Sequence, residues 1–423
     1  MVSKFKINFI SIIILVYFFY GFYSNENSAG AGGYDGDFKT IWNNLLLLKE
    51  GVFANLANPL YDDSRPPLSY IIHIYFNPFT YNQEIFRISC FIISLFLPVL
   101  FFFAIKKKFP EINKNLLALC SFLLLLSPYF RTTAYWGLGE NYGLIFLVLS
   151  YLSFIRLEED LEKSHKVNNF INIFLTCLFS SLVIYFDQKL IFIPTLILFY
   201  ILNLNIESRF KYLSIIFFFI LSIPYIYLIF SWGSLIPTSA AEARNVGKSI
   251  NLFHPGYCLT IIAFYILPFF LSDVFGKKKI KKIFNKQYLI TSVFFLLYLI
   301  FTFIFGDFET ISKDGKGIIH KLLLIFFENS SLRLLLTFII FFLSFTLIYI
   351  FFENKFDFFI IIYFVVLSFF TFPFYQEYLD PLLIILFFTF FKLKPSLSDI
   401  KMYFIVTYFF LFNFSSKYYY SII

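Results

Sequence analysis

Long apolar runs separated by shorter polar segments make up most of the chain. A helix that crosses a bilayer needs about 20 predominantly apolar residues, and by that measure we predict thirteen transmembrane helices. They span residues 7–23, 84–105, 116–130, 141–157, 170–186, 190–206, 212–233, 257–272, 288–306, 332–352, 358–374, 382–391 and 402–415. We therefore predict an all-α polytopic membrane protein in which residues 1–423 form a single transmembrane domain.

Four longer polar segments connect these helices on one side of the membrane. They are residues 24–83, 234–255, 307–331 and 375–381. In the first segment, Ile41, Leu45 and Leu48 recur at helical spacing. That apolar face is too short to cross a bilayer, so we predict a helix over 37–49 that lies in the membrane interface. Residues 67–76 predict a second interfacial helix, because the stretch begins with a proline, which suits the first helical turn.

Composition and charge support this architecture. Of the 423 residues, 59% are hydrophobic and 14% are charged, whereas soluble domains carry about 25% charged residues. A soluble globular fold is therefore excluded. Lysines concentrate at 106–108 and 277–282, and the positive-inside rule then predicts a cytoplasmic N-terminus in a multi-pass protein of the cell (inner) membrane. The net charge of +8 reflects this topology, and no nucleic-acid partner is expected.

A cleaved signal peptide is the alternative reading of the first helix. Ala29-Gly-Ala31 has the small residues of a cleavage site. The apolar run before it is long for a signal peptide, so we favour a retained helix. Residues 24–83 face the outside in either case.

Acidic residues stand out in the first external segment. Asp35-Gly-Asp37 precedes the first interfacial helix, where the positive end of the helix dipole favours ionised carboxylates. Such a carboxylate can take the proton of an attacking sugar hydroxyl, and two together can hold Mg or Mn. The alternative is local structure, with Asp37 capping the helix and Asp35 in a glycine-rich turn. The dispersed cysteines and histidines predict no metal site of their own.

The layout of the first 200 residues or so resembles a known superfamily. An acidic motif after the first helix, two short interfacial helices and Arg65-Pro-Pro-Leu68 before the second transmembrane helix resemble the GT-C integral-membrane glycosyltransferases. The nearest branch is similar to the protein O-mannosyltransferases and lipid A aminoarabinose transferases, with some likeness to dolichyl glucosyltransferases. Beyond that region the resemblance is one of topology.

The resemblance implies roles for residues of the first segment. The catalytic acid of the family corresponds to Asp35 or Asp37, although the motif here is Asp-Gly-Asp where the family has Asp-Glu. The basic residue of the family's Lys-Pro-Pro-Leu motif corresponds to Arg65. A guanidinium can bind two phosphate oxygens at once, which suits a lipid phosphate. The alternative for Arg65 is a solvated loop arginine.

Further positions correspond less closely to family motifs. Arg131 and Glu140 fall where the family has an arginine followed by an acid in its second external loop, with Glu in place of Asp. The resemblance implies that both contact the substrate, with Arg131 assisting Arg65 at the lipid phosphate. Interfacial snorkelling is the alternative for both. The turn 187–189 matches a polar turn of the family, or is an ordinary turn. Late in the chain, Gln376, Glu377 and Asp380 match a polar motif that opens a final helix, or form an ordinary external turn. In the first case they would line the sugar pocket, in one external cavity with Arg65, Glu140 and one of Asp35 and Asp37.

The external segment 307–331 offers a last group of candidates. It contains Lys313, Lys316, His320 and Lys321 as phosphate or acceptor contacts, although runs of charge are usually solvated.

Together these features predict a hexosyl- or pentosyltransferase of cell-envelope glycan synthesis. It would move a sugar from a polyprenyl phosphate to a glycan, lipid or protein acceptor on the extracytoplasmic face, with no cofactor beyond Mg or Mn. One alternative is a Wzy-type polysaccharide polymerase or ligase, which would place its largest external loop late in the chain. A transporter of lipid-linked glycans is the other, and it would show paired broken helices.

Overall fold

The computed structural model describes residues 2–29, 33–162, 166–237, 240, 250–274, 281–306, 308, 315–371 and 374–422. Helices are the regular structure throughout these ranges, which contain no strand. The chain divides into two compact units: the first is Met1–Ala243 with Phe412–Ile423, and the second is Arg244–Leu411. The single functional domain expected over residues 1–423 stays a prediction.

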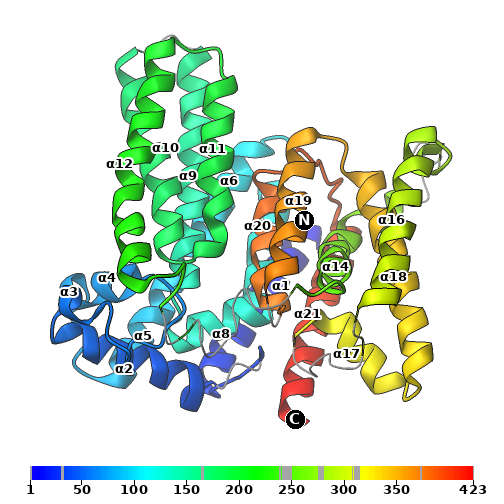
Figure 1. Cartoon of the computed structure of the whole chain (residues 1–423), viewed down its shortest axis with the longest axis horizontal. Helices are drawn as coiled ribbons and strands as arrows, with labels where there is room; N and C mark the ends of the chain where they lie inside the picture. Colours follow the sequence, from blue (N-terminus) through cyan, green and yellow to red (C-terminus); the bar gives the residue numbers. More distant parts are fainter. Residues whose placement is uncertain are drawn as a thin grey trace. The chain divides into compact units, whose positions relative to one another are not determined.

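The first unit holds the N-terminal helices. They are α1 (Val2–Tyr23), the π-helix η1 (Tyr34–Phe38), α2 (Lys39–Lys49), α3 (Val52–Asn55), α4 (Leu68–Phe76), α5 (Gln83–Ser94), α6 (Phe96–Lys108), α7 (Lys114–Phe122), η2 (Leu123–Leu126), α8 (Pro128–Trp136), α9 (Glu140–Glu162), α10 (Lys166–Leu182), η3 (Val183–Tyr185), η4 (Gln188–Ile191), α11 (Phe192–Asn203) and α12 (Ser208–Trp232). Helix α10 packs against α9, α11 and α12. Figure 1 shows these four helices side by side, with α2 to α5 gathered at one end of them.

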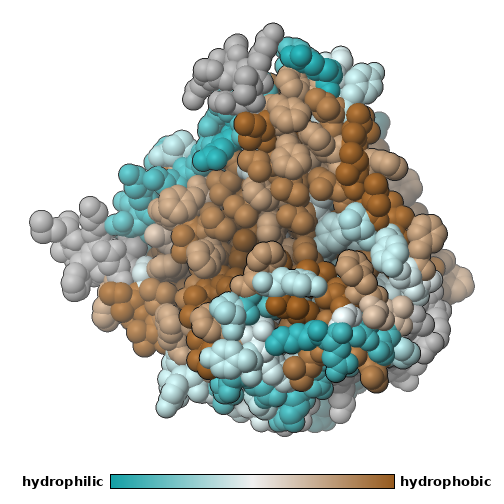
Figure 2. All heavy atoms as spheres, turned by 90° about the vertical axis from the view of Figure 1, so that its left-hand side faces the viewer, coloured by the Kyte–Doolittle hydropathy of each residue, from teal (hydrophilic) through white to brown (hydrophobic). Residues whose placement is uncertain are grey.

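The outer face of this unit is suited to lipid. On α12, Phe219 and Phe230 are among many large apolar side chains that lie exposed. Figure 2 shows apolar residues across the middle of this face and hydrophilic residues at its upper and lower edges. Exposed apolar surface on this scale marks a membrane-facing side in a helical protein.

Helix α1 belongs to the core of the first unit. The Phe18 ring lies 5.2 Å from the Tyr135 ring and 5.3 Å from the Phe91 ring, and it is fully buried. Tyr17 donates a hydrogen bond to Asn413 near the end of the chain, over 2.6 Å. Helix α1 is therefore a packing element of the first unit, and its retention in the mature protein stays a prediction.

The second unit is built around one central helix. Its helices are α14 (His254–Val274), α16 (Lys286–Phe305), α17 (Gly317–Phe326), α18 (Ser330–Phe351), α19 (Lys355–Phe370), η5 (Gln376–Tyr378) and α20 (Leu382–Phe388), and α21 (Asp399–Ile422) begins in this unit and ends in the first. Helix α14 packs against α17, α18, α19 and α20. Helix α17 was missed by the sequence analysis, which treated residues 307–331 as a polar loop.

The structure confirms helices that could cross a membrane, but it does not show all thirteen predicted crossings. Within the described ranges, five helices are long and apolar enough to cross a bilayer. They are Gln83–Lys108, Ser208–Trp232, His254–Leu271, Lys286–Phe305 and Ser330–Phe351. A bent pair raises the number to six. Each of the thirteen predicted segments overlaps at least one helix of the described residues, but shorter apolar helices such as Phe9–Tyr23 and Gln188–Asn203 account for several of them.

The third predicted span is not one straight helix. Lys114–Leu126 and Pro128–Trp136 meet at an angle of 68°. A proline disfavours helical backbone in the residue before it, and Ser127 is extended, with ψ at 123°. The Ser127 hydroxyl then accepts a hydrogen bond from the Phe130 backbone N–H at 2.9 Å, which caps the new helix. The Ser-Pro pair at 127–128 was the local signal for this break.

The two short helices of residues 24–83 form where the sequence predicted them. Helix α2 ends at Lys49, just before Gly51, and α4 runs from Leu68 to Phe76 after Pro67. Helices α2 and α4 pack against each other. Their orientation in a membrane interface stays a prediction.

Candidate functional site

Arg65 lies in the loop that leads into α4, and this loop is tightly hydrogen-bonded. The Asp63 carboxylate accepts the Arg65 backbone N–H at 3.0 Å, and the Tyr61 hydroxyl donates to the Arg65 carbonyl at 2.8 Å. Tyr70, on α4, donates to the other Asp63 oxygen at 2.6 Å. The backbone that carries Arg65 is thus held between two buried tyrosines and one buried aspartate.

The Arg65 guanidinium is paired with two carboxylates. Its Nη1 lies 3.0 Å from Asp63 Oδ1, and its Nη2 pairs with Glu140 Oε1 at the start of α9. Tyr129 donates its hydroxyl to the same Glu140 oxygen. The structure therefore brings together Arg65 and Glu140, two residues that the sequence analysis proposed for one site. We call this group, Asp63, Arg65, Tyr129 and Glu140, the Arg65 cluster.

The cluster is charged and only partly closed. Burial lowers the pKa of the Arg65 guanidinium, but the adjacent Glu140 and Asp63 carboxylates outweigh it and hold that pKa above its ordinary value. The guanidinium therefore stays protonated. Its side chain keeps 19% of its surface exposed, whereas Asp63 keeps 2% and Glu140 keeps 6%. One edge of Arg65 thus remains accessible beside two buried acids.

A third segment, the turn at 187–189, adjoins the cluster. Gln188 donates its amide to the Ser64 carbonyl at 2.7 Å, which joins the turn to the Arg65 loop. Asp187 accepts the Lys189 backbone N–H at 3.0 Å and pairs with its ammonium at 3.2 Å. Burial raises the pKa of Asp187; the Glu140 charge adds to this rise, while Lys189 and Arg65 act against it. The charges of Glu140 and Arg65 therefore act on Asp187, and the turn adjoins the Arg65 cluster electrostatically as well as through the Gln188 hydrogen bond.

Two acceptor atoms at this place are buried and receive no hydrogen bond from any described residue. They are Glu140 Oε2 and Gln188 Oε1. Leaving a buried acceptor unsatisfied costs about 1–3 kcal/mol, so most such atoms in proteins have a partner. A ligand with hydroxyl donors would satisfy both.

Small residues allow the segments to meet. A Cβ added to Gly139 would lie 3.1 Å from Ser69 Oγ on α4, and one added to Gly143 would lie 3.2 Å from Phe186 Cβ. Gly137 ends α8 with a left-handed backbone, φ 74°, which most residues adopt only with strain. These glycines let the start of α9, and with it Glu140, approach α4 and the 187–189 turn.

Asp35 and Asp37 lie in the π-helix η1, and the helix-capping interpretation of them is wrong. The N-cap positions of η1 and α2 are Gly33 and Phe38, and neither makes a side-chain capping hydrogen bond. The reason is that the helix continues backward through both aspartates. The Asp35 side chain is 81% exposed and pairs with Lys39 one turn later, at 2.6 Å. The proposed placement of either aspartate near Arg65 stays a prediction.

Arg131 is occupied by a different partner. Its Nε and Nη2 donate to the two Glu26 oxygens, each over 2.7 Å, and its side chain is fully buried. Nη1 and Nη2 also donate to the Leu125 and Tyr17 carbonyls, each over 3.2 Å. In the structure Arg131 therefore pairs with Glu26, and Glu140 pairs with Arg65. The predicted contact of Arg131 with a lipid phosphate stays a prediction.

The polar motif of Gln376, Glu377 and Asp380 belongs to the second unit. Gln376 accepts the Ile318 backbone N–H at 2.8 Å and donates to Tyr265 at 3.3 Å, so it joins η5 to α17 and α14. Asp380 is buried, and Glu377 is half-buried. A role for these three residues in the same site as Arg65 stays a prediction.

The candidates around α17 are largely enclosed. The His320 ring shares a 2.9 Å hydrogen bond with Tyr257, and burial lowers the pKa of His320 to about 3, with the charge of Lys316 as a further cause. Lys316 is itself buried. Lys313 lies outside the described residues.

No group of three or more His, Cys, Asp or Glu side chains suited to a metal ion occurs in the part of the chain that the structure describes. The carboxylates of η1, Asp35 and Asp37, remain the pair that the sequence analysis considered for Mg or Mn.

Sequence reasoning missed two members of the cluster. Asp63 and Tyr129 were not assigned roles, although Asp63 stands two residues before Arg65. An aspartate at that spacing often bonds the backbone N–H two residues on, and this was an available signal. Nothing local marks Tyr129, because its partner Glu140 lies across the break between α8 and α9.

Comparison with known proteins returned no relative. No protein-family model matches the chain, and neither does any curated protein or solved structure.

Proposed function

We propose that the protein is a multi-pass glycosyltransferase of the inner membrane with a GT-C-like layout. In this proposal the shorter apolar helices complete thirteen crossings, and the N-terminus is cytoplasmic. The enzyme moves one sugar from a polyprenyl phosphate to a glycan, lipid or protein acceptor at the extracytoplasmic face.

The observation that carries this proposal is a pair of buried oxygen atoms, at or beside the Arg65 cluster, that receive no hydrogen bond. A sugar phosphate combines hydroxyl donors with an anionic group. Glu140 Oε2 and Gln188 Oε1 are buried acceptors that hydroxyl donors would satisfy, and the Arg65 side chain, which is partly exposed, carries a guanidinium suited to a phosphate oxygen.

The proposed reaction is direct displacement at the anomeric carbon. The acceptor hydroxyl oxygen bonds to that carbon, and the bond from the carbon to the phosphate oxygen breaks. The hydroxyl proton passes to Asp35 or Asp37 as general base. The lipid phosphate leaves with the bonding electrons, and Arg65 stabilises its charge.

Cells with and without the protein provide the first test, through their profile of lipid-linked sugars. Loss of the protein is expected to cause accumulation of one polyprenyl-phosphate sugar, and re-expression should clear it. An unchanged profile would contradict the proposal. Addition of multi-sugar blocks would instead indicate a polymerase, and a product located on the wrong face would indicate a transporter.

The base is tested with Asp35→Asn and Asp37→Asn in reconstituted protein. Asparagine is nearly the same size but takes no proton, so loss of a general base should slow transfer by about 100- to 10,000-fold. Because Asp35 is exposed and neither residue caps a helix, both variants should insert and unfold like the wild type. Near-normal transfer by both variants would exclude this loop as the source of the base.

A further inference from the structure

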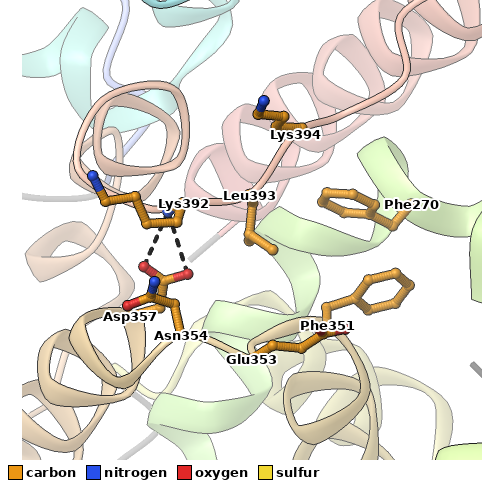
Figure 3. Close-up of a pocket in the computed structure, with 8 residues that line it drawn as sticks. All are labelled: Phe270, Phe351, Glu353, Asn354, Asp357, Lys392, Leu393 and Lys394. Atoms are coloured by element: carbon orange, nitrogen blue, oxygen red, sulfur yellow. Dashed lines mark hydrogen bonds between the residues drawn. The ribbon is translucent and has the colours of Figure 1, made fainter.

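A cavity in the second unit lies at the end where α18 finishes and α19 begins. Its volume is about 490 Å³, within the range of about 300–1,000 Å³ typical of small-molecule sites. Figure 3 shows Phe270 and Phe351 on one side of it and Asp357 with Lys392 on the other, with Leu393 between them. The cavity therefore has one aromatic wall and one polar wall.

The aromatic wall is rigid and apolar. The Phe270 ring, near the end of α14, and the Phe351 ring, at the end of α18, have centroids 4.7 Å apart. Both side chains are almost fully buried. Helix α18 also carries exposed apolar residues, including Leu335 and Leu343, as expected of a helix in contact with lipid.

The polar wall is held by a buried carboxylate. Asp357 accepts the Lys392 backbone N–H at both oxygens, at 3.0 and 3.3 Å, as Figure 3 shows. Asp357 is 1% exposed. This contact fixes the segment 392–394 across the cavity.

Acids and lysines both line this end of the cavity. Glu353 pairs with Lys282, whose ammonium also donates to the Ile350 carbonyl at 3.1 Å. Lys392 and Lys394 are exposed and line the cavity. Lys394 makes no hydrogen bond or ion pair with any other described residue. The rim therefore offers positive charge to an anion.

We propose that this cavity binds the phosphate head group of an anionic phospholipid, with the start of its acyl chain against Phe270 and Phe351. Basic pockets at the cytoplasmic ends of transmembrane helices recognise such head groups, and the distribution of Lys and Arg assigns this end of the second unit to the cytoplasm. An anionic phospholipid fits because one molecule supplies both the charge for the rim and the hydrocarbon for the aromatic wall. The proposal does not depend on sugar transfer.

The test measures retained phosphatidylglycerol on full-length protein. Wild-type protein, taken from phosphatidylcholine bilayers that contain a minor fraction of phosphatidylglycerol, is examined by native mass spectrometry. The test variant is Lys392→Gln with Lys394→Gln. Its matched control is Lys286→Gln with Lys355→Gln, which removes two exposed lysines at the same end but outside the cavity.

The test variant should lose phosphatidylglycerol affinity by roughly 5-fold per lysine, while the control keeps it. Equal losses in both variants would overturn the proposal in favour of general surface attraction. Displacement of the lipid by inorganic phosphate alone would also overturn it, because the site would then recognise a free anion. If the double variant does not fold, Lys394→Gln alone serves, since that side chain has no structural contact to lose.

Discussion

The first unit contains two arginines that each pair with a glutamate far away in the sequence, yet the two pairs differ in kind. Arg131 meets Glu26 through two parallel hydrogen bonds and has no exposed surface. Arg65 meets Glu140 through one guanidinium nitrogen and keeps an exposed edge. The closed pair is complete by itself, whereas the open pair leaves Glu140 Oε2 buried without a donor.

The surroundings of the closed pair leave no room for a ligand. The Tyr17 ring centroid lies 4.2 Å from the Arg131 guanidinium carbon, and Lys417 adds a 3.3 Å contact to Glu26. A Cβ added to Gly21 would lie 2.6 Å from the Tyr135 hydroxyl and 2.8 Å from Glu26. Four hydrogen bonds from a fully buried guanidinium are typical of a structural ion pair. The Arg65–Glu140 pair differs, because Glu140 Oε2 receives no hydrogen bond and the Arg65 side chain is partly exposed.

Breaking the closed pair should have the largest effect on stability. Glu26→Gln leaves the Arg131 charge buried without a counter-charge, which typically costs about 3–5 kcal/mol. The measurement is thermal unfolding in detergent. Glu159→Gln is the control, because its pair with Lys107 is partly exposed and should contribute about 0–1 kcal/mol. Equal stability of the two variants would show that the closed pair is not structural.

Exchanging arginine for lysine at the two positions should separate activity from stability. Lysine keeps the charge but loses the planar fork. Arg65→Lys should reduce sugar transfer by about 100- to 1,000-fold, as for loss of a donor to developing charge, with a smaller change in unfolding temperature. Arg131→Lys should lower the unfolding temperature and leave the activity of the folded fraction intact. The reverse pattern would exchange the roles of the two arginines.

The smallest expected effect concerns how folding stability depends on pH. It should differ between Glu26, in the closed pair, and Asp187, beside the Arg65 cluster. Although burial alone would raise it, the pKa of Glu26 is held below its ordinary value of 4.5 by the hydrogen bond and charge of Arg131. The pair therefore stabilises the fold fully above about pH 4.5, and this contribution is lost as the pH falls through the lowered pKa. Asp187 has a raised pKa, so its contribution to stability increases as the pH falls through that pKa.

Unfolding temperatures measured from pH 7 down to pH 3 test this contrast. The stability difference between wild type and Glu26→Gln should shrink below about pH 4.5. Asp187→Asn should be at least as stable as the wild type at pH 7, because it removes a carboxylate whose charged form the fold disfavours. A less stable Asp187→Asn protein, with Asn still capping Lys189, would contradict the assigned direction.

Several elements of the fold followed from local sequence. The predicted helix over 67–76 matches α4 (Leu68–Phe76), because a helical period, a proline at one end and an Asn-Pro pair at the other are all local signals. The bend at Ser127 was equally local, but the apolar run across it concealed the break. Apolar length also suggested crossings such as 382–391, where α20 has 7 residues.

Which charges meet was decided by tertiary structure. The sequence by itself determined a helical membrane protein with its acids and arginines concentrated near helix ends. It could not distinguish Arg65 from Arg131, because both are arginines in polar segments beside apolar helices. Their partners lie 75 and 105 positions away in the chain, and the approach of those segments depends on side-chain packing and on small residues such as Gly21 and Gly139. Burial then set the difference: packing enclosed the Arg131–Glu26 pair completely, and it left the Arg65 side chain partly exposed beside Glu140, which is the feature on which the proposed function depends.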